Sequence, residues 1–402
     1  MKFVLVGNHN SQWTARSAER GARAHAKAQQ LGVSVVSSYY TQGRFDFVTV
    51  IDSPDAETAS RFSIWYAAQG FGTVETLRGF SSAEMEILCR DLLVDETQPS
   101  NPAPAQNHLM TAARQALQTH VFGSYTQAEL DLEYNPRLSV LNFPEIAQEW
   151  ASLSRAAREH MDARLDIAYG ESAAETLDVF LPENGADAPI HIFFHGGYWR
   201  SGDKSDYSFV AESLVGAGAM VVIPNYTLCP TCTMDELLAQ CYRAIRWVYD
   251  NAGSFKGDRS RIHISGHSAG AHIVTMAMTA GKDHGLPEGL IKSGCAVSGL
   301  YNLEPLRRSF LNLEIRLDPQ LVLECSPSEC IRLTAAPLML SLGGLESTEF
   351  HRQTFDYFAS WQGEGNVAKI IPALDTNHYS VLDAFIDPSH PLGKSVIEQL
   401  YS

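Results

Sequence analysis

A glycine-flanked serine is the residue of this chain best suited to nucleophilic chemistry. Residues 266–270 read GHSAG, which matches the pattern Gly-x-Ser-x-Gly. The apolar segment before the motif is typical of a β-strand, and AHIVTMAMTA after it is typical of a buried helix. Glycines at both ends permit a sharp strand-to-helix turn that exposes the hydroxyl of Ser268. The sequence therefore predicts Ser268 as a nucleophile.

A second glycine motif can supply the hydrogen-bond donors that acyl transfer needs. The apolar segment IHIFF runs directly into HGGYW at residues 195–199. Backbone N–H groups from such a loop, and from the residue after the nucleophile, stabilise a developing oxyanion. We therefore expect Gly197, Tyr198 and Ala269 to form an oxyanion hole. His195 precedes the serine in the chain, so we expect it to organise the loop rather than to act as a base.

A carboxylate and a histidine follow the serine in the order that this chemistry requires. Glu346 follows the apolar segment PLMLSLG, and His378 follows the last expected strand, AKIIPAL. A serine hydroxyl needs a base to take its proton and a carboxylate to orient that base. We expect His378 to be the base and Glu346 the acid. Glu349, one helical turn further on, is the alternative acid, whereas Asp375 lies too close in sequence to His378.

The elements that must position these residues form an α/β pattern from about residue 130 onward. Short apolar strands alternate with helices, which indicates a mostly parallel sheet covered on both faces. The expected strands are TLDVF, IHIFFH, MVVIPNY, RIHISG, GCAVSG, PLMLSLG and AKIIPAL. Residues 298–336 contain helical fragments and no strand pattern, so we expect a small helical cap over the site.

The N-terminal part of the chain follows a different pattern. Its elements alternate as strand, helix, strand, strand, helix, strand, which is the order of a ferredoxin-like α+β sandwich. The segment DETQPSNPAPAQ (residues 95–106) sustains neither helical nor strand periodicity. We therefore predict a ferredoxin-like domain at 1–94, a linker at 95–125 and an α/β domain at 126–402.

The N-terminal residues resemble the GYD-type domain. The resemblance rests on YTQGRFDF (residues 40–47) and GFGTVET (residues 70–76), with Phe45 where that pattern usually has tyrosine. The resemblance implies no agreed chemistry, and Asp55 is as suited to a helix cap as to a ligand contact. Because an antiparallel sheet of this type has a free face and free edges, we expect a scaffold that supports a homo-oligomer.

Composition excludes several classes of partner. The 402 residues include 30 basic and 46 acidic ones, and the formal charge of −16 repels nucleic acid and anionic membrane surfaces. No apolar run approaches the roughly 18 residues that span a bilayer, so we expect a cytoplasmic protein. Seven scattered cysteines argue against a disulfide framework. Cys229 and Cys232 form a CxxC pair without a second pair, so we expect neither a metal site nor a redox role.

The residues from about 130 to the end of the chain resemble an α/β-hydrolase of the arylformamidase (kynurenine formamidase) type. The segments that carry the resemblance are LDLEYNPR, FFHGGYWRSGDKSDYSFVA, GHSAGAH, SGLYNLEPL, GGLESTEFHRQ and DTNHYSVL. Tyr198 stands where esterases of neighbouring families tend to have a third glycine, so Tyr198 and Trp199 favour a flat substrate. Asn302 stands where the family more often has aspartate.

The resemblance implies a serine hydrolase that cleaves an N-formyl aryl amide through an acyl-Ser268 intermediate, with no metal or organic cofactor. A carboxylesterase or carbamate hydrolase acting on an aromatic substrate stays open, because an oxyanion hole does not distinguish an amide from an ester. An alternative of another class is a binding or scaffold protein with an idle hydrolase fold. The intact order of Ser268, Glu346 and His378 disfavours that alternative.

Overall fold

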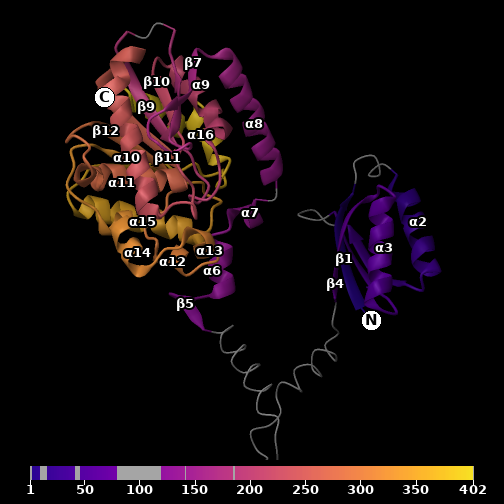
Figure 1. The fold of residues 1–402 in the computed structure, drawn as a ribbon. Helices are drawn as coiled ribbons and strands as arrows, with labels where there is room; N and C mark the ends of the chain where they lie inside the picture. Colours follow the sequence, from indigo (N-terminus) through magenta and orange to yellow (C-terminus); the bar gives the residue numbers. More distant parts are fainter. Residues whose placement is uncertain are drawn as a thin grey trace, which may run out of the picture. The chain divides into compact units, whose positions relative to one another are not determined.

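The chain divides into two compact units, Met1–Arg114 and Gln115–Ser402. The computed structural model, drawn in Figure 1, describes residues 2–9, 16–40, 46–78, 119–140, 142–183 and 186–401. The predicted linker at 95–125 lies mostly outside the described residues. At its end the structure differs from the prediction, because β5 (His120–Phe122) and β6 (Tyr125–Thr126) pair as a small hairpin.

The first unit has the expected α+β order. Its elements are β1 (Lys2–His9), α2 (Ser17–Gln30), β2 (Ser34–Tyr40), β3 (Phe47–Asp52), α3 (Ala56–Ala68) and β4 (Gly72–Arg78). The strands form an antiparallel sheet in the order β2-β3-β1-β4, and both helices lie on one face of it (Figure 1). The ferredoxin-like prediction is confirmed.

Apolar residues facing the two helices form the core of this unit. Phe3 and Leu5 of β1 and Ile51 of β3 are buried against Phe62 of α3. Asp55 precedes the first residue of α3, and its carboxylate accepts the N–H of Thr58 at 2.7 Å. Asp55 therefore caps a helix, which was one of its two expected roles.

The second unit is built on an eight-stranded sheet. Its strands are β7 (Ala163–Ala168), β8 (Thr176–Phe180), β9 (Ala188–Phe194), β10 (Met220–Pro224), β11 (Gly257–His267), β12 (Ile291–Val297), β13 (Leu338–Ser341) and β14 (Ala368–Ile370). The order is β14-β13-β12-β11-β9-β10-β8-β7, with parallel pairing from β10 to β14 and antiparallel pairing at β8 and β7. The mostly parallel sheet was expected, but β7 was not, because most of its side chains face solvent and it lacks an apolar run.

Helices cover both faces of this sheet and bury two separate cores. The principal helices are α8 (Phe143–His160), α9 (Ala211–Gly216), α10 (Met234–Asn251), α11 (Ala269–Thr279), α15 (Thr348–Gly363), α16 (Val381–Ile386) and α17 (Pro391–Gln399). Along β9, Ile190 and Ile192 pack into one core and Phe193 packs into the other. Strands buried on both faces explain the continuous apolar runs in the sequence.

Short helices occupy the segment that was expected to cap the site. They are α12 (Glu304–Arg307), α13 (Asn312–Ile315), α14 (Pro319–Cys325) and the 3₁₀ helix η4 (Pro327–Glu329). Two other helical turns precede the sheet, α6 (Gln127–Glu133) and α7 (Pro136–Ser139), and the 3₁₀ helix η1 (Lys204–Val210) follows β9. Among the described residues, no helix is long and apolar enough to cross a membrane.

Candidate active site

Ser268 lies on a strained turn between β11 and α11. Its φ and ψ are 57° and −118°, a conformation that residues with side chains rarely adopt and that occurs at functional sites. A Cβ atom on Gly270 would lie 1.9 Å from the carbonyl oxygen of Phe194, so only glycine fits beside β9. The N–H of Ser268 donates to Val297 of β12 at 2.8 Å, which fixes the turn against the sheet.

The structure brings the predicted base and acid to this serine. Nε2 of His378 lies 3.1 Å from Oγ of Ser268, and Nδ1 of His378 lies 2.7 Å from Oε2 of Glu346. The side chains of His378 and Glu346 are 4% and 0% exposed. Glu346 follows β13 and His378 follows β14, so neighbouring parallel strands deliver both groups at one edge of the sheet.

The second carboxylate oxygen of Glu346 is also occupied. Oε1 accepts the hydroxyl of Ser298 and, at 2.7 Å, the N–H of Gly343. Ser298 directly follows β12 and was not predicted from the sequence. Its place at the carboxyl end of a central strand is the signal that identifies it in retrospect.

Glu349, the alternative acid, lies in a different network. Its carboxylate accepts the hydroxyl of Tyr134 at 2.7 Å and binds the guanidinium of Arg352 at 2.8 and 2.7 Å. Burial alone would raise the pKa of Glu349, but the contacts with Arg352 and Tyr134 outweigh it and hold the pKa below its ordinary value. Asp375 is exposed. Glu346 is therefore the carboxylate that contacts His378.

The loop after β9 has the form needed for an oxyanion hole. Gly197 has a φ of 117°, and a Cβ atom there would lie 2.0 Å from the carbonyl oxygen of Ser201. Within the described part of the chain, the N–H groups of Gly197 and Tyr198 donate to no backbone acceptor. Ala269 is the first residue of α11, where an N–H has no acceptor within the helix. The three expected donors are thus available to a ligand.

Comparison with known proteins identifies the two units. Residues 9–88 match the GYD domain, and residues 177–298 match the family described as BD-FAE. A kynurenine formamidase of Danio rerio is 28% identical over 69% of this chain and 97% of its own length. A kynurenine formamidase of Salmo salar is 28% identical over 61% of this chain and 84% of its own. The second unit is an α/β-hydrolase that is similar in sequence to kynurenine formamidases.

A solved structure agrees with this assignment. A protein of Silicibacter sp. tm1040 that is named as a thioesterase superposes with a TM-score of 0.60 and 28% identity. The match covers 68% of this chain and 99% of that one. The shared fold and the relatives place the hydrolase among formamidases and esterases.

The cavity of the hydrolase is largely aromatic and opens onto Ser268 and His378. It has a volume of about 270 Å³, and its aromatic lining consists of Tyr134, Phe143, Trp150, Tyr198, Tyr207, Phe310 and Tyr379. The rings of Phe143 and Tyr379 lie 4.3 Å apart. The hydroxyl of Tyr198 donates to the carbonyl oxygen of Tyr134 at 2.8 Å, which holds the oxyanion loop against the cavity wall.

The structure separates the two aromatic residues that were expected to contact substrate. Tyr198 lines the cavity, whereas Trp199 is 0% exposed and does not line it. The ring of Trp199 instead packs edge-on against His272 at 4.8 Å, in the core beneath the loop. The expected contact of Trp199 with substrate is therefore corrected to a packing role, because its ring is fully buried against His272.

Part of the cavity wall comes from a segment that the sequence reasoning did not assign to the site. Residues 134–150 contribute much of the lining, whereas the expected cap at 298–336 contributes Phe310. The segment LDLEYNPR was the available signal, since it belongs to the arylformamidase resemblance without containing a reactive motif. Asn302 does not line the cavity, and its side chain accepts the N–H of Glu304 at 2.9 Å in a turn.

His195 contacts residues that fix the conformation of the loop after β9. Its ring stacks on Tyr226 at 4.5 Å, and its nitrogens lie 2.8 Å from the carbonyl oxygen of Gly196 and 3.1 Å from Oδ1 of Asn225. Burial lowers the pKa of His195 and outweighs the contacts with Gly196 and Asn225, which raise it. These contacts match the loop-organising role expected for His195.

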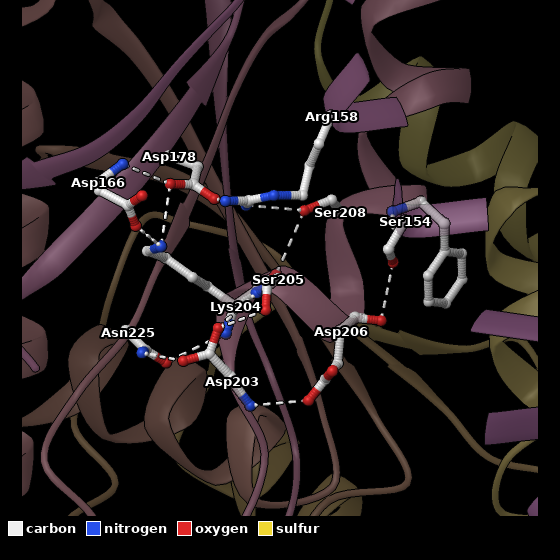
Figure 2. A network of polar contacts seen from close by, with 11 residues as sticks. Ser154, Arg158, Asp166, Asp178, Asp203, Lys204, Ser205, Asp206, Ser208 and Asn225 are labelled. Atoms are coloured by element: carbon white, nitrogen blue, oxygen red, sulfur yellow. Dashed lines mark hydrogen bonds and ion pairs between the residues drawn. The ribbon is translucent and has the colours of Figure 1, made fainter. Parts of the chain in front are cut away.

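A buried polar network anchors the oxyanion loop to the sheet (Figure 2). Asn225 donates to Asp203 at 2.7 Å and also contacts His195. Next to Asp203, Lys204 is buried and pairs with Asp178 of β8 at 3.1 Å. Because the buried charges of this network are paired, they rigidify the site rather than strain it.

The CxxC cysteines, Cys229 and Cys232, are free thiols, and the N–H of Cys229 donates to the carbonyl oxygen of Trp199 at 2.8 Å.

Proposed function

We propose that this hydrolase cleaves N-formyl aryl amides of the N-formylkynurenine kind through a formyl-Ser268 intermediate. The observation that carries the proposal is the 3.1 Å contact between Ser268 and His378, placed at an aromatic-lined cavity. Aromatic walls favour a flat aryl group by stacking and burial. The kynurenine formamidases of Danio rerio and Salmo salar support the formamide assignment.

The proposed reaction has two stages, transfer of the formyl group to Ser268 and hydrolysis of the formyl ester. The same groups act in both stages. Nε2 of His378 takes the proton of Ser268 as Oγ attacks the formyl carbon, and the carbonyl oxygen becomes an oxyanion. The N–H groups of Gly197, Tyr198 and Ala269 stabilise that oxyanion. His378 then gives its proton to the nitrogen of the leaving aryl amine, and the C–N bond breaks. Water attacks the formyl ester, with His378 again as base, and formate leaves.

Glu346 serves His378 throughout this cycle. Its Oε2 accepts a hydrogen bond from the N–H at Nδ1, at 2.7 Å, which leaves Nε2 free to take the proton of Ser268. The carboxylate also stabilises the imidazolium that forms transiently. Ser298 and Gly343 fix the carboxylate through its other oxygen.

A second candidate is ester hydrolysis at the same site, whether of a carboxylic ester, a thioester or a carbamate of an aromatic group. The structural relative from Silicibacter sp. tm1040, named as a thioesterase, favours this candidate. A comparison of kcat/KM for an aryl formamide and the matched aryl formate ester separates the two. A clear preference for the formamide, corrected for the higher intrinsic reactivity of the ester, supports formamidase activity, and turnover of the ester alone contradicts it.

We also propose that the GYD domain joins copies of the chain. Core residues of β1 and β3 face α2 and α3, so the alternating residues face the side of the sheet opposite these helices. On that side Val4 pairs with Val50 and Val6 with Val48 across the two strands. We expect Val50→Lys to lower the mass of the full chain in light scattering. An unchanged mass contradicts this role for the sheet face.

The compartment that fits these observations is the cytoplasm. All the cysteines that the structure describes are free, and most of them are buried. Free cysteines persist in a reducing compartment. Fractionation of cells that contain the tagged full chain tests this proposal, and a membrane or extracellular location contradicts it.

A further inference from the structure

His267, the residue before the nucleophile, carries a buried side chain that takes no part in the proposed proton transfers. It is the last residue of β11, and its backbone pairs with Val297 of β12. The residue is 2% exposed and forms part of the cavity wall. Because the sheet fixes the backbone of His267, the strand that delivers Ser268 also sets the position of this ring.

The ring of His267 contacts the main chain of the proposed base. Its Nε2 lies 2.7 Å from the carbonyl oxygen of His378. A carbonyl oxygen only accepts hydrogen bonds, so the proton of the ring is on Nε2. Within the described part of the chain, no main-chain N–H donates to this carbonyl oxygen. His267 is therefore the donor that holds the backbone of His378.

This hydrogen bond joins two loops that the sheet keeps apart. Ser268 follows β11 and His378 follows β14, and β12 and β13 lie between these two strands. His378 itself lies in a turn, before α16 begins at Val381. Since the pairing of parallel strands does not fix the loops that follow them, the contact from His267 links the base directly to the segment that carries the nucleophile.

The rest of the ring packs against the base and the oxyanion loop. The ring centres of His267 and His378 lie 4.8 Å apart. A Cβ atom on Gly196 would lie 3.2 Å from Nδ1 of His267, and this nitrogen is buried without a hydrogen-bond partner among the described residues. An unpartnered buried nitrogen costs free energy that an apolar residue would avoid. The contact from Nε2 to His378 is what a histidine supplies at this position.

The ring can make this contact without opposing the charge of the base. Burial lowers the pKa of His267, the neighbouring His378 lowers it further, and the hydrogen bond to the His378 carbonyl raises it only in part. A neutral ring does not repel the imidazolium that forms when His378 takes the proton of Ser268. A lysine could donate the same hydrogen bond, but its charge would oppose that imidazolium.

We propose that His267 is a positioning residue that fixes the main chain of His378 and thereby the distance between His378 and Ser268. The inference rests on the proposed function, since it adds a residue to the same reaction. Misplacement of a catalytic group by about 1 Å can lower a rate about 100-fold. Loss of the contact should therefore lower kcat and leave KM nearly unchanged.

The rate constant for labelling of Ser268 by a fluorophosphonate tests this position without a substrate. We expect His267→Asn to lower it about 10- to 100-fold, whereas His267→Gln should stay within about threefold of the unaltered chain. The amide nitrogen of glutamine reaches about as far from the backbone as Nε2 of histidine, and that of asparagine does not. Steady-state kinetics on an aryl formamide and an aryl ester should show the same factor in kcat. A loss confined to KM would mean that His267 contacts substrate instead, and it would overturn the positioning role.

The matched control is His272, the second histidine of GHSAGAH. Its Nε2 lies 2.7 Å from the carbonyl oxygen of Cys325, and its Nδ1 is also buried without a hydrogen-bond partner among the described residues. His272→Asn therefore removes the same kind of buried contact, but from a carbonyl that does not belong to His378. We expect this variant to be labelled within about threefold of the unaltered chain.

The outcomes separate this inference from the proposed function. Equal labelling rates for His267→Asn and His267→Gln, or for His267→Asn and His272→Asn, overturn the positioning role. The rate constant describes only the folded molecules, so a variant that folds in part still gives a decisive result. An unaltered chain that is labelled but turns over no formamide overturns the proposed function, while the labelling rates still test His267.

Discussion

The hydroxyl of Ser298 donates a hydrogen bond to Glu346, on the carboxylate oxygen that His378 does not contact. This contact couples the end of β12 to the acid that follows β13. A hydrogen bond to a charged group contributes about 1.5 to 3 kcal/mol. Ser298 therefore holds the carboxylate in the orientation that His378 requires.

We expect Ser298→Ala to lower kcat about tenfold with KM nearly unchanged, because Glu346 keeps the N–H of Gly343 but loses one of its two anchors. Steady-state kinetics on an aryl formamide measures the effect. Ser341→Ala is the control, since that hydroxyl donates to Ile371 rather than to Glu346. Equal kcat values for the Ser298 and Ser341 variants would show that the Ser298 contact does not serve catalysis.

Substitution of the two neighbouring glutamates should separate catalysis from stability. Glu346→Gln should lower kcat by about two to four orders of magnitude, less than loss of Ser268 or His378, because the acid orients the base without touching substrate. Glu349→Gln should lower the free energy of unfolding instead, since Glu349 binds Tyr134 and Arg352. Kinetics and urea unfolding on both variants measure this. The reverse pattern would mean that Glu349 serves as the acid and that Glu346 contributes to stability.

Buried histidines should make the hydrolase sensitive to mild acid. Burial lowers the pKa of His191 to about 3 and the pKa values of His263 and His272 to about 4. In the unfolded chain these rings take up a proton below about 6.5, so the unfolded state binds more protons and stability falls as pH decreases from 6.5 toward 4. A ring with a folded pKa near 4 contributes roughly 3 kcal/mol over this window.

The measurement is the free energy of unfolding in urea between pH 7 and 4. The variant His191→Gln, which removes one of the three rings, should show a shallower decline than the unaltered chain. A free energy of unfolding that stays constant from pH 6.5 to 4.5 is incompatible with neutral buried rings.

Removal of the GYD domain should leave the chemistry in place. A chain that begins at Asn107 retains the whole unit Gln115–Ser402, which forms its own core and contains Ser268, Glu346 and His378. We expect it to fold and to keep kcat on a small formyl ester within about threefold, because an independent domain folds alone. Its mass by light scattering should fall by more than the mass of the removed domains, because the shortened copies should no longer associate. Unchanged assembly with abolished kcat would mean that the GYD domain completes the site.

Much of the fold could be predicted from the sequence because both sheets follow simple patterns. Strands such as β9 and β10 are buried on both faces and appear as unbroken apolar runs, whereas β7 is polar and was missed. Residues 120–125 were assigned to the linker, because a two-strand hairpin this short has no periodicity.

The proposed reacting residues, Ser268, Glu346 and His378, could be selected from the sequence because each follows a strand, at a fixed place in the chain order. The contacts around them could not, since Ser298, Tyr134 and Arg137 belong to no reactive motif and meet the site only through packing. The sequence also did not indicate in which direction each side chain of the loop points. Tyr198 and Trp199 are adjacent in sequence, yet one lines the cavity and the other is buried against His272.

Covalent labelling of the serine tests the central claim most directly. A fluorophosphonate reacts with a serine that a neighbouring base activates. Nε2 of His378, the proposed base, lies 3.1 Å from Oγ of Ser268. Mass spectrometry of the labelled full chain should show one adduct per chain, on Ser268, and none on Ser268→Ala, with labelling of His378→Ala slowed by about three orders of magnitude or more. A folded chain that stays unlabelled, or an adduct on another serine, would contradict the account and restore the interpretation of an idle hydrolase fold.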